Sequence, residues 1–383
     1  MTSRAEVAVV GLGAAGSAAL LALARRGVRA VGLDRYSPPH PLGSTHGRSR
    51  IIREAYYESP VYVPLVQAAY EAWARIEDES GRRLLDVTGG VMLGPAESGL
   101  IQGALRSARA HGLRHELLDG VELQRRLPAF AIPEGTVGLW EPRAGILDPE
   151  ACVTSCLELA ERFGADLRRN TRVTGWSRLG EGIRVETTTG SLDCGRVILA
   201  AGAWMGELCG ELGLPLTVER QVMAWFAPEP RAPFMADALP VFIWEWEPER
   251  TFYGIPDQGA GFKVAGHHDG ETTTPDTVDR TVTPRDIDGL RALLRRFIPA
   301  ADHPPTDAVT CLYTNTPDRD FVLGAHPQEP RVLLASPCSG HGFKFASAVG
   351  EVLADLVIEG TTPMDLVPFR PDRFGPATAS GKA

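Results

Sequence analysis

A glycine-rich turn near the N-terminus constrains the fold of this chain more than any other feature. Residues 5–10 are apolar apart from Glu6 and indicate a short strand, and Gly11, Gly13 and Gly16 follow it at once. A helical pattern then runs over residues 15–26. In such a turn the first glycine permits the tight bend, the second lets the backbone approach a pyrophosphate, and the third allows close helix–strand packing. The segment therefore predicts a dinucleotide site, with the phosphates at the start of the helix.

A second strand and an acidic residue complete the pattern. Residues 29–33 indicate this strand, and Asp34 ends it where a carboxylate that binds a ribose is expected. The alternative is a plain βαβ unit with a small-residue turn, but all the parts of a dinucleotide site fall here in order. The motif alone does not distinguish NAD from FAD.

Two later segments favour FAD. Residues 184–193 indicate a hairpin, followed by a strand from 196 that ends in small residues before Trp204. Residues 331–335 indicate another buried strand, followed by a glycine loop at 339–342 and a helix from 343 to about 358. The start of that helix would stabilise the negative charge that develops on a reduced flavin. The alternative for this last part is an ordinary αβ unit.

Composition narrows the class of protein. The chain has 383 residues, too many for one compact core, so two connected domains are expected. Its net charge of −9 and the lack of a basic stripe argue against nucleic-acid binding. The apolar stretch 7–24 carries glycines in its middle, so we expect a turn there and neither a signal peptide nor a membrane anchor. After Phe374 a tail containing Pro, Gly and Ser is expected.

Cysteine and lysine usage is also informative. The six cysteines include no CxxC pair, so we expect no disulfide framework and no metal site, with a reducing cytoplasm as the default. Cys152 and Cys156 share one face of a predicted helix and are expected in the core. Lysine occurs only at Lys263, Lys344 and Lys382, and every other basic residue is Arg. A retained Lys indicates a place where a guanidinium does not fit.

Several unusual blocks resemble a known family. These blocks are 43–53, 62–65, 220–222, 253–263, 310–318 and 339–345. They are similar to those of monomeric sarcosine oxidase and N-methyltryptophan oxidase, which are FAD-dependent amine oxidases of the D-amino-acid oxidase superfamily. The similarity runs over nearly the whole chain, and segments 220–226 and 367–370 look closer to the N-methyltryptophan enzyme.

The resemblance implies a role for each matching residue. Cys311 matches the cysteine joined to the flavin 8α-methyl by a thioether. Lys263 matches the lysine over the flavin whose ammonium stabilises superoxide as O₂ takes its first electron. Arg53 and Lys344 match the pair that holds the substrate carboxylate. Arg50 matches an arginine beside the flavin and is counted among the catalytic residues.

Further residues are expected around the substrate and the cofactor. Tyr253, His267 and Tyr313 match side chains near the substrate amine and its reacting carbon, and Ile243 and Trp244 are expected to line the substrate pocket. The residues expected to bind the cofactor are Gly11, Gly13, Ala14, Ala15, Gly16, Asp34, Arg35, Ser44, Thr45, Arg50, Ile51, Val173, Ala201, Gly202, Trp204, Cys311, Gly340, His341, Gly342 and Lys344.

Without the resemblance of the surrounding blocks, the same side chains would be interpreted as ordinary structural residues. Two arginines usually form surface salt bridges, a lysine is usually solvated, and a lone cysteine or tyrosine usually belongs to the core. His267 and His268 are adjacent, so only one of them can face the site from a strand. His341 follows a glycine and has packing as its alternative.

The chain departs from the family in two places. Thr45 stands where the family usually has a second histidine, Arg48 replaces an aspartate and Ser49 replaces a threonine, which leaves the hydrogen bonding around Arg50 open. The segment 243–250, with Trp244 and Trp246, is one residue longer, so the pocket shape there is open too.

The overall expectation is an α/β (α+β) fold. A Rossmann-like FAD-binding domain of the glutathione-reductase type is predicted from residues 1–85, 145–215 and 320–383. A substrate domain on a mixed or antiparallel sheet is predicted from residues 86–144 and 216–319.

The expected activity is FAD-dependent oxidation of a secondary amino acid by O₂, giving hydrogen peroxide and, from an N-methyl substrate, formaldehyde. The alternatives are an oxidase or dehydrogenase of glycine, proline or pipecolate, and a nicotinamide-dependent or non-catalytic nucleotide-binding protein. The protein is expected to be a cytoplasmic monomer that binds neither nucleic acid nor membrane.

Overall fold

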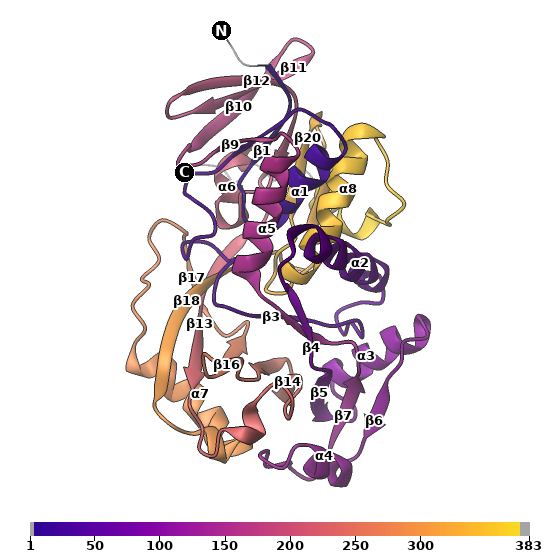
Figure 1. Ribbon diagram of the computed structural model, residues 1–383, viewed down its shortest axis with the longest axis vertical. Helices are drawn as coiled ribbons and strands as arrows, with labels where there is room; N and C mark the ends of the chain where they lie inside the picture. Colours follow the sequence, from indigo (N-terminus) through magenta and orange to yellow (C-terminus); the bar gives the residue numbers. More distant parts are fainter. Residues whose placement is uncertain (1–3, 376–383) are drawn as a thin grey trace.

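Two large sheets dominate the protein, whose computed structural model describes residues 4–375. The first sheet and its helices fill the upper half of Figure 1, and the second sheet fills the lower half. Residues 376–383, which hold most of the expected tail and Lys382, lie outside the described residues.

The first sheet contains the glycine turn. Its eight described strands are β1 (Arg4–Val10), β2 (Ala30–Leu33), β9 (Asp166–Arg168), β10 (Val173–Leu179), β11 (Gly182–Thr187), β12 (Gly190–Leu199), β19 (Val322–His326) and β20 (Glu329–Ser336). The order is β10-β11-β12-β1-β2-β9, with β20 also beside β12 and β19 beside β20. The central pairs are parallel, whereas β10, β11 and β19 pair in the antiparallel sense.

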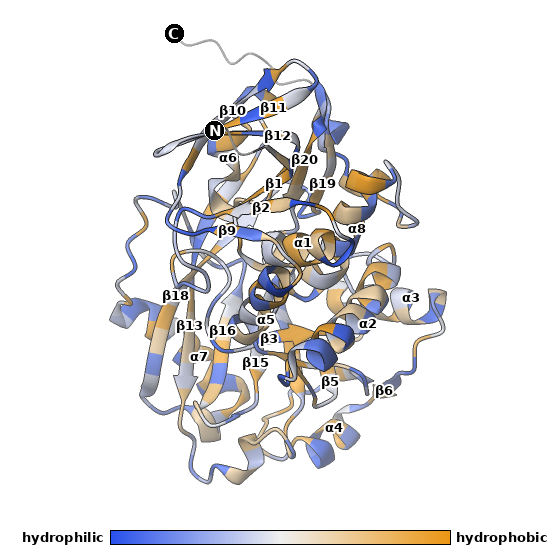
Figure 2. Cartoon of the chain, turned by 45° about the horizontal axis from the view of Figure 1, so that its top comes forward, coloured by the Kyte–Doolittle hydropathy of each residue, from blue (hydrophilic) through white to orange (hydrophobic). Residues whose placement is uncertain are grey.

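Four helices cover one face of this sheet. They are α1 (Ala14–Arg25), α2 (Tyr62–Ser80), α5 (Pro149–Arg162) and α8 (Ala346–Ile358), and their apolar residues form one cluster with Val7, Val9, Ile198 and Leu333. Figure 2 shows α1 mostly in hydrophobic colours. A second cluster, with Val10, Leu199 and Met205 of the short helix α6 (Met205–Leu208), covers the other face. All four residues of β2 are buried, as expected for a parallel strand covered on both sides.

The expected elements occur with small shifts. The apolar stretch 7–24 folds into β1, the turn and α1, and no helix within residues 4–375 is long and apolar enough to cross a membrane. The predicted hairpin is β11–β12, but β12 is one continuous strand that ends at Leu199, and residues 202–204 form a 3₁₀ turn whose first residue, Gly202, has φ +55°. The last helix begins as a 3₁₀ turn at Phe343–Phe345 before α8.

The second sheet is almost entirely antiparallel. Its nine described strands are β5 (Gly90–Pro95), β6 (Glu116–Leu118), β7 (Thr136–Glu141), β13 (Thr217–Phe226), β14 (Val241–Glu247), β15 (Arg250–Ile255), β16 (Phe262–His267), β17 (Glu271–Thr273) and β18 (Pro305–Asn315). Only β14 and β5 pair in parallel among them. The helices α3 (Gly99–Ala110), α4 (Gly120–Arg126) and α7 (Pro284–Phe297) accompany it, and α7 contributes Leu290, Leu294 and Phe297 to its core.

A small sheet lies between the two large ones in Figure 1. It contains β3 (Arg50–Ile52), β8 (Gly145–Leu147) and β4 (Leu85–Val87). Strands of the first large sheet come from residues 4–33, 166–199 and 322–336, and those of the second from 90–141 and 217–315. This distribution supports the predicted domain boundaries, which we retain as a proposal.

Candidate active site

A pocket extends from the glycine turn to the facing residues of the second sheet. At its nucleotide end the wall contains Gly11, Gly13, Ala14 and Ala15 from the start of α1. Gly16 lies behind this wall, and a Cβ at Gly16 would lie 1.7 Å from the carbonyl oxygen of Gly11. Only glycine therefore permits the helix to pack so closely on the turn.

Asp34 braces the same turn. One carboxylate oxygen accepts a hydrogen bond from the N–H of Leu12 at 2.7 Å, and the other accepts from the N–H of Tyr36, also at 2.7 Å. Gly13 caps α1 without a side-chain hydrogen bond, and the N–H of Ala14 donates only weakly to Thr45 Oγ1, at 3.4 Å. The start of α1 thus has N–H groups available for an anion.

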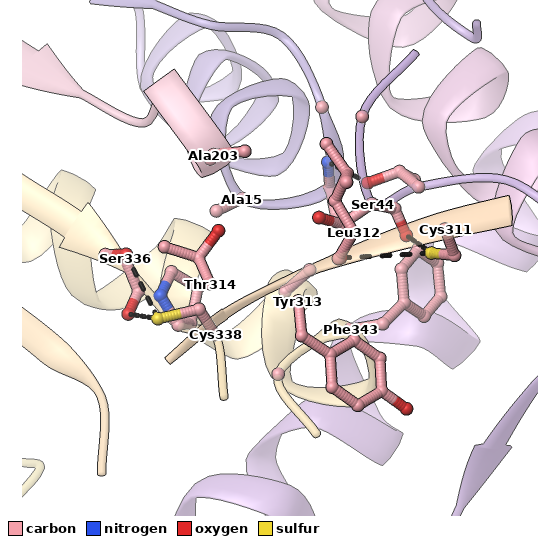
Figure 3. A pocket seen from close by; sticks show the side chains of 18 of the residues that line it. Ala15, Ser44, Ala203, Cys311, Leu312, Tyr313, Thr314, Ser336, Cys338 and Phe343 are labelled. Carbon is pink, nitrogen blue, oxygen red and sulfur yellow. Dashed lines mark hydrogen bonds between the residues drawn. The ribbon is translucent and has the colours of Figure 1, made fainter. Parts of the chain in front are cut away.

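The middle of the pocket fits a flavin. Thr314 belongs to the wall (Figure 3), and its Oγ1 is buried and has no hydrogen-bond partner among residues 4–375. Gly340 has φ +77°, and a Cβ there would lie 2.5 Å from the ring of Tyr313. A buried hydroxyl without a partner and a wall that excludes a side chain are both expected where a polar cofactor binds. The residues present therefore fit FAD.

Cys311 and Arg50 lie together in this pocket. Strand β18 pairs with β13 along its whole length and presents the Cys311 thiol to the wall (Figure 3). Arg50 Nη2 lies 3.7 Å from Cys311 Sγ and donates to the carbonyl of Ser44 at 2.9 Å, while Nη1 donates to the carbonyl of Ser49 at 2.8 Å. Backbone carbonyls accept these hydrogen bonds, so the side chains at positions 45, 48 and 49, where the chain departs from the family, are not needed to hold Arg50.

Lys263 is fully buried next to this pair. Its Nζ donates to the carbonyls of Gly47 (2.8 Å) and Ser49 (2.9 Å) and to Ser49 Oγ (3.3 Å). The ammonium lies 5.3 Å from the centre of the Trp225 ring. Burial first, and then the charge of Arg50, lower the pKa of Lys263 well below its ordinary value. Lys263 is absent from the residues that line the pocket, so it lies just behind the wall.

Two further cations lie in the wall. Arg53 is 4% exposed and lies between the rings of Tyr56 and Tyr57, at 4.2 and 4.6 Å from their centres. Its Nη2 donates to both carboxylate oxygens of Glu58, at 2.8 and 2.7 Å. The Nζ of Lys344 donates to the carbonyl of His341 at 2.7 Å, and burial first, then the charge of Arg53, lower its pKa to about 7.

Local contacts place these two cations. The carboxylate of Glu141 accepts from the N–H groups of Glu54 (3.0 Å) and Ala55 (2.6 Å), which fixes the chain just after Arg53. Burial raises the pKa of Glu141 to about 7. The indole of Trp73 on α2 donates to the carbonyl of Lys344 at 2.9 Å.

Three neutral polar side chains line the wall beside the cations. His267 Nδ1 lies 3.2 Å from the hydroxyl of Tyr313, and Tyr253 lines the same pocket. Burial lowers the pKa of His267 well below its ordinary value and raises those of Tyr253 and Tyr313, so all three are uncharged at neutral pH. His268 follows the end of β16 with φ +57° and does not line the pocket, although its ring lies 4.2 Å from that of His267 and 5.5 Å from that of Tyr313.

Trp244 does not line the pocket. Ile243 lines the pocket, but Trp244 points to the opposite face of β14 and packs against Phe130, Phe252 and Phe297. We therefore correct the expectation of a substrate contact from Trp244. The register of β14 shifts between Glu245 and Glu247, which accommodates the longer segment as a bulge away from the pocket.

The other expected cofactor residues lie in the pocket wall. They are Arg35, Ser44, Thr45, Ile51, Val173, Ala201, Gly202, Trp204, His341 and Gly342. His341 contacts the hydroxyl of Tyr56 through Nδ1 and the carbonyl of Arg319 through Nε2 at 3.0 Å, so hydrogen bonds at both nitrogens hold its ring. The structure adds wall residues that the sequence pattern did not single out: Tyr57, Glu58, Thr314 and Cys338. Tyr57 and Glu58 directly follow the block around Arg53, and that adjacency was the available signal.

Comparison with known proteins decides the family. A profile described as FAD dependent oxidoreductase matches residues 6–356. The chain belongs to this family of FAD-dependent oxidoreductases. It is 41% identical to a monomeric sarcosine oxidase of Streptomyces avermitilis, over 99% of this chain and 100% of the relative. It is 34% identical to an N-methyl-L-tryptophan oxidase of Salmonella arizonae, over 96% of this chain and 99% of the relative.

Solved structures agree with the fold. The structure of NikD, described as an unusual amino acid oxidase essential for nikkomycin biosynthesis, superposes with a TM-score of 0.83 at 26% identity, over 97% of this chain and 98% of that one. An L-proline dehydrogenase from P. horikoshii gives a TM-score of 0.85 at 24% identity, which shows a shared fold. The expected family, the α/β fold with its antiparallel second sheet, and flavin-dependent amine oxidation are thereby confirmed.

Proposed function

We propose that this chain oxidises the C–N bond of an N-methyl amino acid, such as N-methyltryptophan or sarcosine, with O₂ as the electron acceptor. The products are the primary amino acid, formaldehyde and hydrogen peroxide, with one water consumed. The observation that carries the proposal is the pair of buried cations, Arg53 and Lys344, in the wall of the FAD pocket. It is supported by identity of 41% and 34% to enzymes named for such substrates.

FAD, when bound, accepts a hydride equivalent from the amine and passes the electrons to O₂. Arg53 and Lys344 bind the substrate carboxylate, because a forked guanidinium and a compact ammonium together match its two oxygens. Glu58 must give up part of its contact with Arg53 when the substrate enters, since its carboxylate occupies the same Nη2 group.

The charges around the site favour the reactive form of the amine. An amine releases hydride from its neighbouring carbon only when its nitrogen is unprotonated. Arg50, Arg53 and Lys344 repel a protonated amine and so lower its pKa on binding. His267, Tyr253 and Tyr313 are neutral, so they orient the nitrogen by hydrogen bonds without adding charge.

Two residues act on the cofactor side. Lys263 places a cation behind the pocket wall, where it stabilises the negative charge that O₂ acquires with its first electron. Cys311 holds the flavin covalently through a thioether to the 8α-methyl group. Forming that bond would remove two electrons and two protons from the thiol and the methyl group together, and O₂ would accept them. The six free cysteines support a cytoplasmic protein, and we expect it to be a monomer.

The test is a peroxide-coupled screen of N-methyl amino acids beside glycine, proline and pipecolate, each with O₂ and with an artificial electron acceptor. We expect peroxide from an N-methyl amino acid at the highest kcat/KM. Turnover of only primary or cyclic amino acids, or turnover with the artificial acceptor alone, would overturn the proposal. A colourless preparation that binds no FAD would do so as well.

A further inference from the structure

Residues 274–283 join β17 to α7 and contact the nucleotide-end loops from outside. None of the described residues that line the pocket comes from this segment. It nevertheless contacts Arg35 and Trp204, which are wall residues, and the loop at 41–42. This connecting segment, which follows a strand of the second sheet, thus contacts loops of the first sheet beside the cofactor pocket.

Asp276 is the central contact. Its Oδ1 accepts a hydrogen bond from the indole Nε1 of Trp204 at 2.9 Å, and Arg35 Nη1 lies 2.9 Å from the same oxygen and 3.2 Å from Oδ2. The Arg35 guanidinium lies 5.6 Å from the centre of the Trp204 ring and 5.4 Å from that of Tyr36. One carboxylate therefore holds two long side chains, which also pack on each other and on the ring of Tyr36.

The segment that carries Asp276 is itself held at its far end. Arg280 Nη2 donates to the carbonyl of Leu42 at 2.6 Å. Arg220 of β13 donates to the carbonyls of Asp279 (2.8 Å) and Thr281 (2.7 Å) and pairs with Asp286 at 2.9 Å. These contacts fix the backbone of the segment that carries Asp276. They therefore also fix where its carboxylate meets Arg35 and Trp204.

We propose that Asp276 is a positioning residue for the cofactor, which fixes Arg35 and Trp204 as the wall at the ribose end of FAD. Arg35 follows Asp34, at the end of β2, where a dinucleotide fold places the ribose. Side chains that are already ordered cost less entropy when the ligand binds. Without Asp276, each molecule of FAD must order both side chains as it binds, so its affinity falls.

The test measures FAD affinity rather than turnover. Cys311→Ala serves as the background, so that a covalent link does not mask release, and apoprotein is titrated with FAD by fluorescence quenching. Adding Asp276→Ala should raise the Kd for FAD by about tenfold, which corresponds to about 1.4 kcal/mol. Asp276→Asn keeps an acceptor for Trp204 but loses the charge opposite Arg35, so an intermediate Kd is expected. The Tm of the apoprotein should stay close to that of the background, while the rise in Tm on adding FAD shrinks.

Asp279→Ala is the matched control, because the Asp279 carboxylate in the same segment accepts from the N–H of Thr281. A Kd within twofold of the background for Asp276→Ala would overturn the proposal. Equal weakening by Asp279→Ala, or an equal loss of Tm in apoprotein and holoprotein, would also overturn it, because the segment would then act only on folding. If FAD already exchanges from the parent protein, the thioether proposal fails, and the same titration runs on the parent.

Discussion

Glu150 and Lys263 hold one turn of the chain from opposite sides. The Glu150 carboxylate accepts from the N–H of Gly47 at 2.7 Å and from that of Arg48 at 3.2 Å. The Lys263 ammonium donates to the carbonyls of Gly47 and Ser49 at 2.8 and 2.9 Å. The turn leads directly into β3, which begins with Arg50. The same turn therefore binds Lys263, the cation proposed to assist the reaction with O₂, and leads into Arg50, the arginine beside Cys311.

Lys263→Met should slow reoxidation of the reduced protein by O₂ by orders of magnitude, because the buried cation is lost. Anaerobic reduction by substrate should change little, and stopped-flow spectroscopy separates the two steps. The pKa of Lys263 lies well below the ordinary lysine value, so the ammonium is lost as pH rises, at a lower pH than for an exposed lysine. The wild-type O₂ reaction should slow over that same rise in pH. Arg48→Met, which removes an exposed cation from the same turn, is the control. Unchanged O₂ kinetics in Lys263→Met would refute the assigned role.

Glu150→Gln should lower the free energy of unfolding by about 1–3 kcal/mol, because a charged acceptor for two N–H groups is lost. It should also slow the O₂ reaction, though less than Lys263→Met does, because the turn that receives the ammonium loosens. Denaturant unfolding and stopped-flow kinetics measure the two effects. Glu158→Gln, on the same helix but paired with Arg82 at the surface, should change neither. Loss of stability with unaltered O₂ kinetics would show that the turn does not affect the reaction with O₂, which would contradict this prediction.

Glu58→Gln should tighten the binding of a simple carboxylate such as acetate. The carboxylate of Glu58 now occupies Nη2 of Arg53, and its removal frees that donor and takes away a negative charge. We expect the Kd of acetate to fall several-fold, whereas Arg53→Met should raise it by about 100-fold. Flavin absorbance titration provides both values. An unchanged Kd in both variants would place the carboxylate elsewhere.

The affinity for acetate should weaken as pH rises through about 7. Lys344 has its pKa lowered to about 7, so the ammonium that attracts the anion is present below that pH and lost above it. Lys344→Arg keeps its charge over this range, so the dependence should flatten. Any slope that remains belongs to Glu141, whose pKa is raised to about 7 and whose ionisation also repels the anion. A full slope in Lys344→Arg would contradict the assignment to Lys344.

Cys311→Ala should yield protein whose flavin appears in the supernatant after acid precipitation, whereas the parent should keep its flavin in the pellet. Cys338→Ala is the matched control, because its thiol lines the same pocket (Figure 3) and should not be attached. Release from both the parent and Cys311→Ala would show that the flavin is not covalent.

Short-range patterns predicted much of this fold. Gly16 has a local steric cause, because a Cβ there would lie 1.7 Å from the carbonyl oxygen of Gly11, and this part of the turn could be predicted from the spacing. Gly11 is required by a distant contact instead, since a Cβ there would lie 2.5 Å from the carbonyl oxygen of Ala200. Cys311 and Tyr313 are two residues apart in a strand and therefore reach the same region.

Features that depend on contacts between distant parts of the chain could not be predicted from the sequence. Whether Ile243 or Trp244 faces the pocket depends on which side of β14 packs against α7, and a strand pattern does not contain that information. The unpartnered hydroxyl of Thr314 likewise emerges only when separate segments meet. Lys263 lies behind the wall because its ammonium is drawn to the carbonyls of the turn at 47–49.

The most direct test follows the products of one N-methyl amino acid. The purified protein is incubated with this substrate and O₂, and formaldehyde, primary amino acid and hydrogen peroxide are measured together. We expect the three products in equal amounts, since one C–N bond is oxidised for each O₂ reduced. Peroxide without formaldehyde, or formaldehyde that forms only with an artificial acceptor, would contradict the account.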